Sequence, residues 1–392
     1  MAYLNTVVPT AGATVIARSV HGLEWVCAAE VSALTGTDDG VTLGRREVVF
    51  SLPAVNAGLL GLRTADDVFL AVGIVGNLGA TKDTLPELGR ACAKLDWESA
   101  LARLRSVRPV PDRPRFDVVA SLEGRRSYNR FAVEASVGSA LAPVLRAEFL
   151  PRERAGRAGG EPDLTVRVFV RDDRATLALR LGARPLHRRA YKTETGPATL
   201  HPPTAAALVA IAAPEAGTLL DPFCGDGTIA IEAALARPGL HVIASDLDPQ
   251  RIANTRRNAR RAGADIEVSL ADAEGLGLPP GGIDAMVTNP PWSRAVGWGG
   301  QLAASQRALW DGLPSLLGGG VLGSLTDVGL DVPDLLERGD WAIGLRQQLR
   351  LAGRVVHLLL AAPRAPAPAL PPALDRWRRL ALETKVVTDT GF

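Results

Sequence analysis

The sequence predicts an α/β protein whose C-terminal half folds around a parallel sheet. An apolar run at residues 217–220 leads into Asp221 and a glycine turn, and an apolar helical segment at 229–236 follows. A second apolar run, residues 240–245, ends in Asp246. Strands that alternate with helices form parallel sheets through right-handed crossovers, so a ligand is expected at the carboxyl ends of the strands.

The turn Asp221-Pro222-Phe223-Cys224-Gly225-Asp226-Gly227-Thr228 has the composition of a nucleotide-binding loop. Its two glycines allow a sharp bend and leave room for a ligand against the backbone. Asp246 lies nineteen positions after Gly227, where an acid can accept hydrogen bonds from both ribose hydroxyls of an adenosine-containing cofactor. No Gly-Lys-Ser/Thr follows the turn, which disfavours a triphosphate site.

A later strand, residues 282–288, runs directly into Asn289-Pro290-Pro291-Trp292. Two acid-ended strands followed by Asn-Pro-Pro-aromatic resemble the amino-group methyltransferases that use S-adenosylmethionine. The alternative is a Rossmann-like domain in which Asn-Pro-Pro is only a turn. With Leu186-His187-Arg188-Arg189-Ala190-Tyr191-Lys192 upstream, the glycine turn resembles the THUMP-domain RNA guanine-N2 methyltransferases. This resemblance spans residues 12–362 and implies a Rossmann-like, seven-stranded, mostly parallel methyltransferase sheet.

Length and composition place the chain in a broad class. Its 392 residues, 47% hydrophobic and 22% charged, are enough for two or three globular domains. No apolar run approaches the ~20 residues of a membrane span, and the N-terminus lacks signal-peptide features. The isolated cysteines 27, 92 and 224 and the scattered histidines do not have the spacing of metal ligands. We therefore expect a cytoplasmic monomer without a metal or a membrane partner.

The net charge of +2 conceals a local excess of arginine. Residues 101–192 contain 20 Arg and Lys against 10 Asp and Glu, which gives +10, whereas the remainder contains 24 against 32, which gives −8. Such an excess is typical of a surface that binds a polyanion. A general preference for arginine is the alternative, but it does not explain why the arginines concentrate here.

The resemblance also divides the chain into regions. It implies a ferredoxin-like domain at residues 1–75, a THUMP RNA-binding domain at 76–190 and the methyltransferase domain at 191–362. Residues 363–392, outside the resemblance, are predicted from their composition to be a Pro-rich linker and a tail. Over residues 12–75 the pattern predicts an α+β unit with a helix whose apolar face includes Leu34, and a second helix at 53–61. The tail is either a docking helix around Trp377 or a mobile segment.

Further elements follow from apolar periodicity and turn residues. In the THUMP-like region we expect helices at 96–104 and 133–147 and strands at 115–121, 164–170 and 175–181. In the methyltransferase region we expect helices at 204–213 and 301–317, strands at 266–270 and 321–326, and an antiparallel pair at 343–349 and 355–361.

The cofactor site follows from the resemblance. It implies that S-adenosylmethionine lies against the glycine turn, with Asp246 on the ribose, Leu247 beside the adenine and Asp272 on the adenine amino group. Cys224 could suggest a thiolate nucleophile, as in C5-pyrimidine methyltransferases, but the resemblance makes it a packing residue. The implied cofactor-binding residues are Asp221, Phe223, Cys224, Gly225, Gly227, Thr228, Asp246, Leu247, Asp272 and Ala273.

The Asn-Pro-Pro-Trp segment can orient an amino nitrogen. The side-chain oxygen of Asn289 and the carbonyl of Pro290 can accept its two hydrogens, and Pro291 fixes φ. Trp292 can stack on the base, an interaction worth ~1–3 kcal/mol, and the target base must leave its helix to reach it. Asp226, where the family commonly has serine, and Trp292, where it has tyrosine or phenylalanine, depart from the usual pattern. The same signature serves adenine-N6 and glutamine-amide methylation, so guanine is implied by the resemblance alone.

RNA contacts are expected from two arginine groups. Arg125, Arg126 and Arg130 could hold phosphate, while Tyr128 and Phe131 either stack on a base or pack in the core. Arg188 and Arg189 either face the target nucleotide or form a basic linker. A single catalytic unit behind a THUMP-like region implies methylation of tRNA at its acceptor region, with position 6 favoured. Guanosine 10 of tRNA, a ribosomal guanine, and an RNA-binding module without catalysis remain as alternatives.

Overall fold

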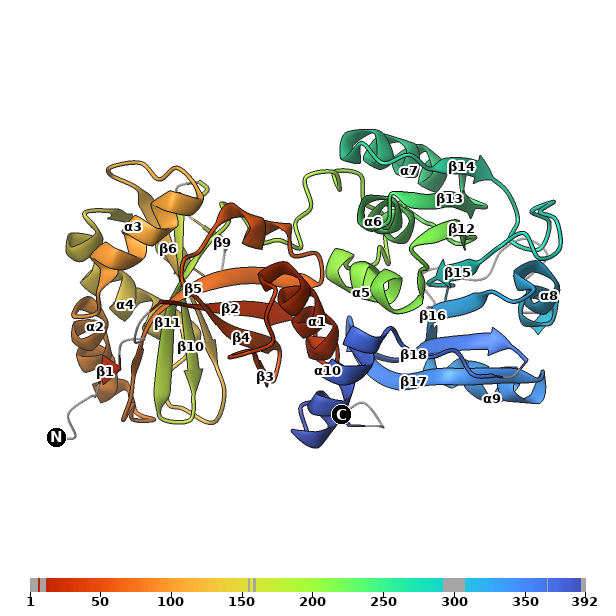
Figure 1. The fold of residues 1–392 in the computed structure, drawn as a ribbon. Coiled ribbons are helices and arrows are strands. Elements are labelled where there is room, and N and C mark those ends of the chain that lie inside the picture. The colour runs from red at the N-terminus through yellow and green to blue at the C-terminus, as the bar shows by residue number, and fades with distance from the viewer. Residues whose placement is uncertain are drawn as a thin grey trace.

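A computed structural model describes residues 6–7, 12–153, 156–157, 160–291, 307–364 and 366–388. They form an N-terminal part and a C-terminal part, each built on its own sheet, and a connecting segment, residues 181–201, joins the two parts (Figure 1). Within the described residues no helix is long and apolar enough to cross a membrane.

The described N-terminal part contains a nine-stranded mixed sheet in the order β3-β4-β2-β5-β11-β10-β6-β7, with β1 also paired to β5. Its strands are β1 (Thr6–Val7), β2 (Ala13–Ser19), β3 (Thr42–Gly44), β4 (Glu47–Leu52), β5 (Ala65–Val75), β6 (Arg115–Leu122), β7 (Glu148–Phe149), β10 (Leu164–Arg171) and β11 (Arg174–Arg180). Because β5 pairs with β11, one sheet joins the two regions that the sequence predicts as separate domains. A small separate ribbon pairs β8 (Arg152–Glu153) with β9 (Gly156–Arg157).

Among the residues described in this part, four α-helices accompany the sheet, with α2, α3 and α4 at one end and α1 at the other (Figure 1). They are α1 (Glu24–Thr35), α2 (Leu85–Ala93), α3 (Trp97–Val107) and α4 (Arg130–Leu145), with the short 3₁₀ helices η1 (Ala57–Gly61) and η2 (Lys82–Thr84). The side chain of Asp96 caps α3 by accepting from the amide of Ser99, and Asn129 caps α4 in the same way. The predicted helices at 96–104 and 133–147 and the strands at 115–121, 164–170 and 175–181 are confirmed within a few residues.

Two predictions in this part are wrong in detail. The segment predicted as a helix at 53–61 forms only the 3₁₀ turn η1, because Pro53, Gly58 and Gly61 disfavour a continuous α-helix. Leu34 is 46% exposed instead of lying on the buried face of α1. It falls in the last turn of α1, just before Gly36 ends the helix, beyond the point at which neighbouring elements cover it.

The described C-terminal part contains a seven-stranded sheet in the order β14-β13-β12-β15-β16-β18-β17. All neighbouring pairs are parallel except those of β18, which is antiparallel to both β16 and β17. The strands are β12 (Ala216–Asp221), β13 (Gly239–Asp246), β14 (Glu267–Leu270), β15 (Ala285–Thr288), β16 (Val321–Asp327), β17 (Trp341–Leu351) and β18 (Arg354–Pro363). The predicted seven-stranded, mostly parallel sheet with its closing antiparallel pair is confirmed.

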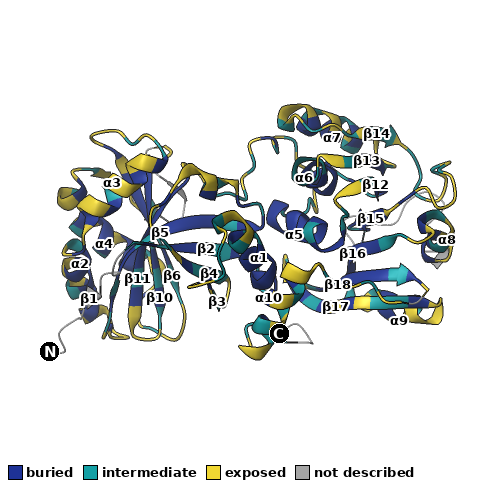
Figure 2. Ribbon diagram, in the orientation of Figure 1, coloured by how far each residue is buried: buried dark blue, intermediate teal, exposed yellow. Residues whose placement is uncertain are grey.

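Helices cover this sheet and bury its central strands on both faces (Figure 2). They are α5 (Pro202–Ala212), α6 (Thr228–Ala236), α7 (Pro249–Ala262), α8 (Arg307–Leu317) and α9 (Val332–Arg338), with the 3₁₀ helix η4 (Val328–Leu330). Leu219, Leu220, Met286 and Val287 are fully buried, as expected for central parallel strands covered on both faces. Residues 301–306 of the helix predicted at 301–317 lie outside the described residues.

The C-terminal segment is a docked helix. Residues 372–383 form α10 (Pro372–Glu383), and Trp377 on this helix is buried in the main hydrophobic core. The Pro-rich run before it packs along β17, where the carbonyl of Pro368 leaves no room for a side chain at Gly344. Of the two alternatives for the tail, the docking helix is the one the structure contains.

Helix α1 joins the two parts through a shared core. Its buried Trp25 belongs to the same hydrophobic cluster as Leu208 of α5, Leu349 of β17 and Trp377 of α10. The carbonyl of Gly22, just before α1, accepts hydrogen bonds from Trp25 Nε1 at 3.0 Å and from Gln347 Nε2 at 2.6 Å. The N-terminal part is therefore held against the C-terminal sheet by packed side chains as well as by the connecting segment.

A buried carboxylate makes a second junction. Glu232 on α6 is fully buried and accepts from Arg63 at 2.7 Å, from Arg189 at 3.0 Å and from the hydroxyl of Tyr191 at 2.7 Å. Arg63 belongs to the N-terminal part, and Arg189 and Tyr191 to the connecting segment. Burial, and after it the proximity of Glu232, raises the pKa of the Tyr191 hydroxyl. One carboxylate thus links three regions of the chain.

Replacing Glu232 with glutamine should weaken this junction, because two guanidinium groups then lose their countercharge in a buried setting. We expect Glu232→Gln to lower the free energy of unfolding by about 3 kcal/mol, measured by urea denaturation of the full chain. Glu215→Gln is the matched control, since Glu215 pairs with Arg237 at 3.1 Å on the surface and should change stability by less than ~1 kcal/mol. Equal effects of the two substitutions would contradict the proposed role of Glu232.

Candidate cofactor and amine-binding site

The candidate site lies where the strand order of the C-terminal sheet reverses. Strand β12 has β13 on one side and β15 on the other, and the chain enters these two neighbours through different crossovers. Ligands of open α/β sheets bind at such a point, outside the carboxyl ends of the strands. Asp221 ends β12, Asp246 ends β13, and Asn289 follows β15 directly. The sheet therefore gathers the predicted motifs at one edge.

Asp221 is a buried carboxylate at the centre of this edge. It is 1% exposed, and its Oδ1 accepts from the hydroxyl of Thr288 at 2.8 Å. Among the described residues its Oδ2 has no hydrogen-bond partner although it is buried. Burial raises the pKa of Asp221 to about 7, although the hydrogen bond from Thr288 acts to lower it. A buried acceptor that lacks a hydrogen-bond partner within the protein is expected where a ligand supplies the donor.

The glycine loop has the backbone that the sequence predicts. Gly225 and Gly227 have φ values of +54° and +83°, which lie in the left-handed region where other residues are strained. A Cβ at Gly225 would meet no atom within 4 Å, so this backbone borders open space. A Cβ at Gly227 would lie 2.7 Å from Thr255 Cγ2, so this glycine allows the loop to approach α7. Gly227 also precedes the first residue of α6, Thr228.

Asp246 joins the loop to the end of β13. Its Oδ2 accepts from the amide of Gly225 at 2.9 Å and its Oδ1 accepts from the amide of Asp248 at 3.0 Å. Burial raises its pKa, and these two donations oppose the shift. A carboxylate oxygen can accept more than one hydrogen bond, so both oxygens retain acceptor capacity for a ribose.

Two leucines at this edge are unusually exposed. Leu247, which follows Asp246, is 43% exposed, and Leu270 at the end of β14 is 56% exposed. The predicted residues Asp272 and Ala273 follow Leu270 by two and three positions, and the amide of the intervening Ala271 donates to the carbonyl of Asp246 at 3.2 Å. Leu270 was not among the predicted site residues, although an apolar residue at the end of a strand, two positions before an expected adenine contact, was the available signal. A flat apolar ring lying here would cover both leucines.

The Asn-Pro-Pro segment lies beside Asp221 because Thr288 precedes it. Asn289 and Pro291 are half-buried and Pro290 is buried. Trp292, predicted to stack on the base, lies outside the described residues. Phe223 is half-buried within the glycine loop, and its amide faces Asp221 Oδ1 at 3.4 Å. The loop and the Asn-Pro-Pro segment are thus brought to the same buried carboxylate.

Cys224 is a packing residue in this structure. The residue is 6% exposed, and its Sγ lies 3.8 Å from the hydroxyl of Thr255. Burial, with the nearby charges of Asp221 and Asp246, raises the pKa of the thiol well above its usual value. A thiol held neutral in this way is a poor nucleophile.

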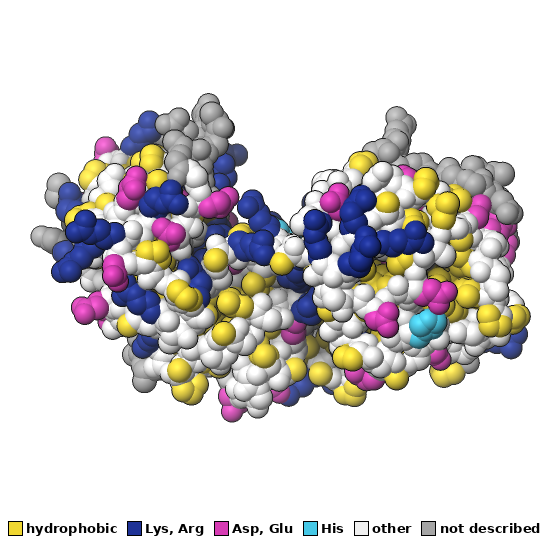
Figure 3. Space-filling model, turned by 90° about the horizontal axis from the view of Figure 1, so that it is seen from above, with side chains coloured by type: hydrophobic (Ala, Val, Ile, Leu, Met, Phe, Trp, Pro, Cys, Tyr) yellow, Lys and Arg dark blue, Asp and Glu magenta, His cyan; other side chains and the backbone are white. Residues whose placement is uncertain are grey.

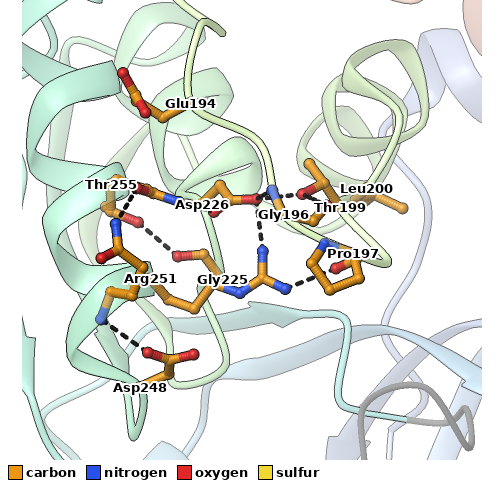
Figure 4. A network of polar contacts seen from close by, with 12 residues as sticks. Glu194, Gly196, Pro197, Thr199, Leu200, Gly225, Asp226, Asp248, Arg251 and Thr255 are labelled. Carbon is orange, nitrogen blue, oxygen red and sulfur yellow. Dashed lines mark hydrogen bonds and ion pairs between the residues drawn. The ribbon is translucent and has the colours of Figure 1, made fainter.

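Asp226, the residue at which the loop departs from the family pattern, anchors the connecting segment (Figure 4). It is buried, and its carboxylate accepts from the amide of Gly196 at 2.8 Å, from the hydroxyl of Thr199, from Arg251 at 2.7 Å and from Asn254 at 2.8 Å. Burial alone would raise its pKa, but the donated hydrogen bonds lower it below the usual value. The sequence did not indicate this role, because the partners are distant along the chain.

The arginines predicted to bind RNA differ in their surroundings. Arg125, Arg130 and Arg188 are exposed, and the Arg130 guanidinium lies 4.7 Å from the centroid of the Phe131 ring. Arg126 instead donates to the carbonyls of Gly79 and Asp172, and Arg189 is engaged by Glu232. Tyr128 is buried and donates to the carbonyl of Gly79 at 3.0 Å, so of its two alternatives the structure contains the packed one.

The raised pKa of Asp221 predicts how the stability of the protein depends on pH. An unfolded aspartate titrates near ~3.9, so between that pH and about 7 the folded protein holds the proton more tightly than the unfolded chain does. The wild-type free energy of unfolding therefore falls as the pH rises through this window. We expect the thermal midpoint of Asp221→Asn to exceed that of the wild type most at pH ~8 and to approach it near pH ~4. Asp248→Asn, an exposed position, is the control, and a constant Asp221→Asn difference across the range would contradict the assignment.

Comparison with known proteins agrees with this geometry. Residues 189–344 match the family described as UPF0020, RMKL-like, methyltransferase domain. The solved structure of TrmN from Thermus thermophilus is similar with a TM-score of 0.71 and 29% identity, over 90% of this chain and 99% of TrmN. The structure of SMU.472, solved in complex with SAH, has a TM-score of 0.67 over 92% of this chain and 100% of its own, and at 18% identity it shows the fold alone.

The sequence relationship extends beyond the domain. The tRNA (guanine(6)-N2)-methyltransferase of Thermus thermophilus is 33% identical over 281 residues, which are 70% of this chain and 77% of the relative. The chain therefore belongs to the family of this Thermus thermophilus methyltransferase, and its residues 189–344 match an RMKL-like methyltransferase domain.

Proposed function

We propose that the enzyme transfers a methyl group from S-adenosylmethionine to the exocyclic N2 amine of guanosine 6 in the acceptor stem of tRNA. The observation that carries the proposal is the placement of Asn289 and Pro290 beside the buried Asp221, through the hydrogen bond from Thr288. The 33%-identical relative, a tRNA (guanine(6)-N2)-methyltransferase, supports the choice of base, RNA and position.

The residues at the strand ends fit S-adenosylmethionine. The unpartnered Oδ2 of Asp221 can accept from the ammonium group of the methionine moiety, and the open space beside Gly225 can admit the moiety itself. Asp246 can hold the ribose hydroxyls, and the exposed Leu247 and Leu270 can pack against the adenine, with Asp272 and Ala273 near its amino edge. When bound, this cofactor supplies a methyl group on a sulfonium, which is a good leaving group.

The chain's own residues would orient the amine. A guanine N2 amine is a weak nucleophile because its lone pair is delocalised into the ring. The Asn289 side-chain oxygen and the Pro290 carbonyl would accept its two hydrogens and direct the lone pair out of the ring plane. Pro291 restricts the backbone that carries both acceptors, and Trp292 would stack on the extruded base. This arrangement needs positioning and exclusion of water, and it does not need a strong general base.

The N-terminal part would bind the RNA. We propose that residues 76–190 act as a THUMP domain, with the exposed Arg125 and Arg130 on phosphates and Arg188 closer to the target nucleotide. Arg126 and Arg189, which are engaged inside the protein, would support the fold of this surface without direct contact. The buried junctions at α1 and Glu232 would keep the distance from this surface to the site constant.

Removal of the Asp246 carboxylate should weaken the cofactor. We expect Asp246→Ala to raise the dissociation constant of S-adenosylmethionine at least tenfold, measured by calorimetry, because two ribose hydrogen bonds and the anchor of Gly225 are lost. Asp265→Ala removes an exposed acid after α7 and is the matched control. If wild-type protein binds no cofactor at millimolar concentration, the proposal is wrong.

Asn289→Ala should lose turnover but keep binding. Loss of a single positioned hydrogen-bonding group lowers rates by about 10²–10³. We therefore expect that decrease in tritium transfer to tRNA from a strain lacking the gene, with unchanged dissociation constants for cofactor and tRNA. Nucleoside mass spectrometry with fragment mapping should find N2-methylguanosine at position 6 with the wild type.

The same mapping separates the other possibilities. N2-methylguanosine at position 10 of tRNA, or only in ribosomal RNA, would show that the proposed substrate position is wrong. N6-methyladenosine as the product would show that the proposed base is wrong. Tight tRNA binding with no transfer by the wild type would indicate a binding module.

A further inference from the structure

Helix α7 presents a row of arginines on its outer face. Its buried face consists of Ile252, Asn254, Thr255, Asn258 and Ala259. The same helix carries five arginines, of which Arg256, Arg260 and Arg261 are exposed; the other two are Arg251 and Arg257. Residues four positions apart stand one turn apart on the same side of a helix, so Arg256 lies above Arg260 and Arg257 above Arg261.

The positive charge of this helix is only partly balanced. Arg251 pairs with Asp226 at 2.7 Å, and Arg257 and Arg261 lie at 3.7 and 3.6 Å from the same carboxylate, Glu194. Five guanidinium groups against these two carboxylates leave three positive charges. Arg256 donates to the carbonyl of Val268. Within the described residues, neither Arg256 nor Arg260 forms an ion pair with a carboxylate.

General effects explain only part of this arrangement. Arg260 and Arg261 are in the last turn, where a positive charge is favoured by the helix dipole. Arg256 and Arg257 lie mid-helix, where that effect is absent, and like charges at i,i+4 destabilise a helix by roughly 0.2–0.5 kcal/mol per pair. A helix that carries this repulsion without acids on its outer face is poorly suited to be a plain solvated surface.

Helix α7 runs from the cofactor edge to the junction between the two parts, and its exposed arginines lie in the half next to the junction. The N-terminus of α7 follows Asp246 and Asp248 of the cofactor edge, and at its other end Arg261 bonds to Thr193 of the connecting segment, which also carries Arg184 and Arg188. Figure 3 views the molecule from the side on which α7 lies at the top of Figure 1. It shows Lys and Arg side chains on the C-terminal part, beside the hollow that separates it from the N-terminal part, and on the facing surface.

We propose that the outer face of α7 is a phosphate-binding surface that holds the sugar-phosphate backbone of the substrate RNA on the catalytic domain. The inference rests on the proposed function and adds to it a binding surface outside the N-terminal part. Arginine suits this role because its planar, permanently charged fork matches phosphate oxygens. RNA is favoured over an acidic protein because the exposed arginines lie in the half of α7 that borders the connecting segment, beside the N-terminal part that we propose to bind the RNA.

The test compares two double neutralisations in the full-length protein. Arg256→Gln with Arg260→Gln removes two arginines from the α7 surface. Arg338→Gln with Arg346→Gln removes the same charge from exposed positions at the opposite edge of the same sheet. Binding of unmethylated tRNA is measured by fluorescence anisotropy over a range of salt concentrations, and binding of S-adenosylmethionine is measured in parallel as a check of folding.

We expect the α7 variant to bind tRNA about tenfold more weakly at ~100 mM salt. The logarithm of the association constant decreases with the logarithm of the salt concentration. For the α7 variant the magnitude of this slope should be smaller by about 2, because each of the two lost phosphate contacts contributes about 0.9. Cofactor affinity should be unchanged, and the control variant should behave like the wild type.

The remaining outcomes separate two kinds of failure. If the wild type binds and methylates tRNA and the α7 variant binds it equally well, the phosphate-binding role of α7 is wrong and the proposed function stands. If both variants lose affinity equally, the effect is one of net charge and the α7 surface is again excluded. If the wild type does not bind tRNA, the inference and the proposed function both fail.

Discussion

The parallel pairing of β12 with β15 is the constraint on which the site depends. Leu219 and Leu220 align with Ala285 and Met286, residues that are distant in sequence and fully buried in the sheet. This register brings Thr288 to 2.8 Å from Asp221, and with it the Asn-Pro-Pro segment to the glycine loop. Burial of these apolar strands by helices on both faces therefore maintains the geometry, and no single polar contact has to do so.

Polar contacts then fix the parts that the sheet leaves free. Asp226 accepts four hydrogen bonds and ties the connecting segment and α7 to the glycine loop. Glu232 ties the same connecting segment to the N-terminal part. In the proposed reaction this matters because a substrate held by one part must reach a site in the other with little freedom. Two buried carboxylates, each with arginine partners, provide that restriction close to the site.

Much of this architecture could be predicted from the sequence, because short-range patterns encode it. Apolar runs that end in Asp221 and Asp246, the paired glycines and the segment after residue 288 indicated the sheet edge and its loop. The long-range uses of charged residues could not be predicted in the same way. An arginine has the same local signal whether it meets solvent, as Arg125 does, or a buried acid, as Arg180 does with Asp67 at 2.7 Å.

The arginine count therefore overstated the basic surface of residues 101–192. Arg126, Arg180 and Arg189 all bond within the protein, and the helix α7, outside that range, carries exposed arginines that the count did not single out. Leu270 was missed, and the tail was left between two alternatives, for a related reason. Whether an apolar side chain is covered depends on which distant element lies over it, and periodicity reports only the local face.

The central claim is that the site positions the N2 amine of one guanosine in tRNA. It is tested most directly with ligated tRNA that carries inosine in place of guanosine at position 6, since inosine lacks only that amine. We predict that the enzyme transfers no methyl group to this tRNA, whereas tRNA with inosine at position 10 is methylated like the unmodified substrate. Equal transfer to the position-6 inosine tRNA would contradict the account.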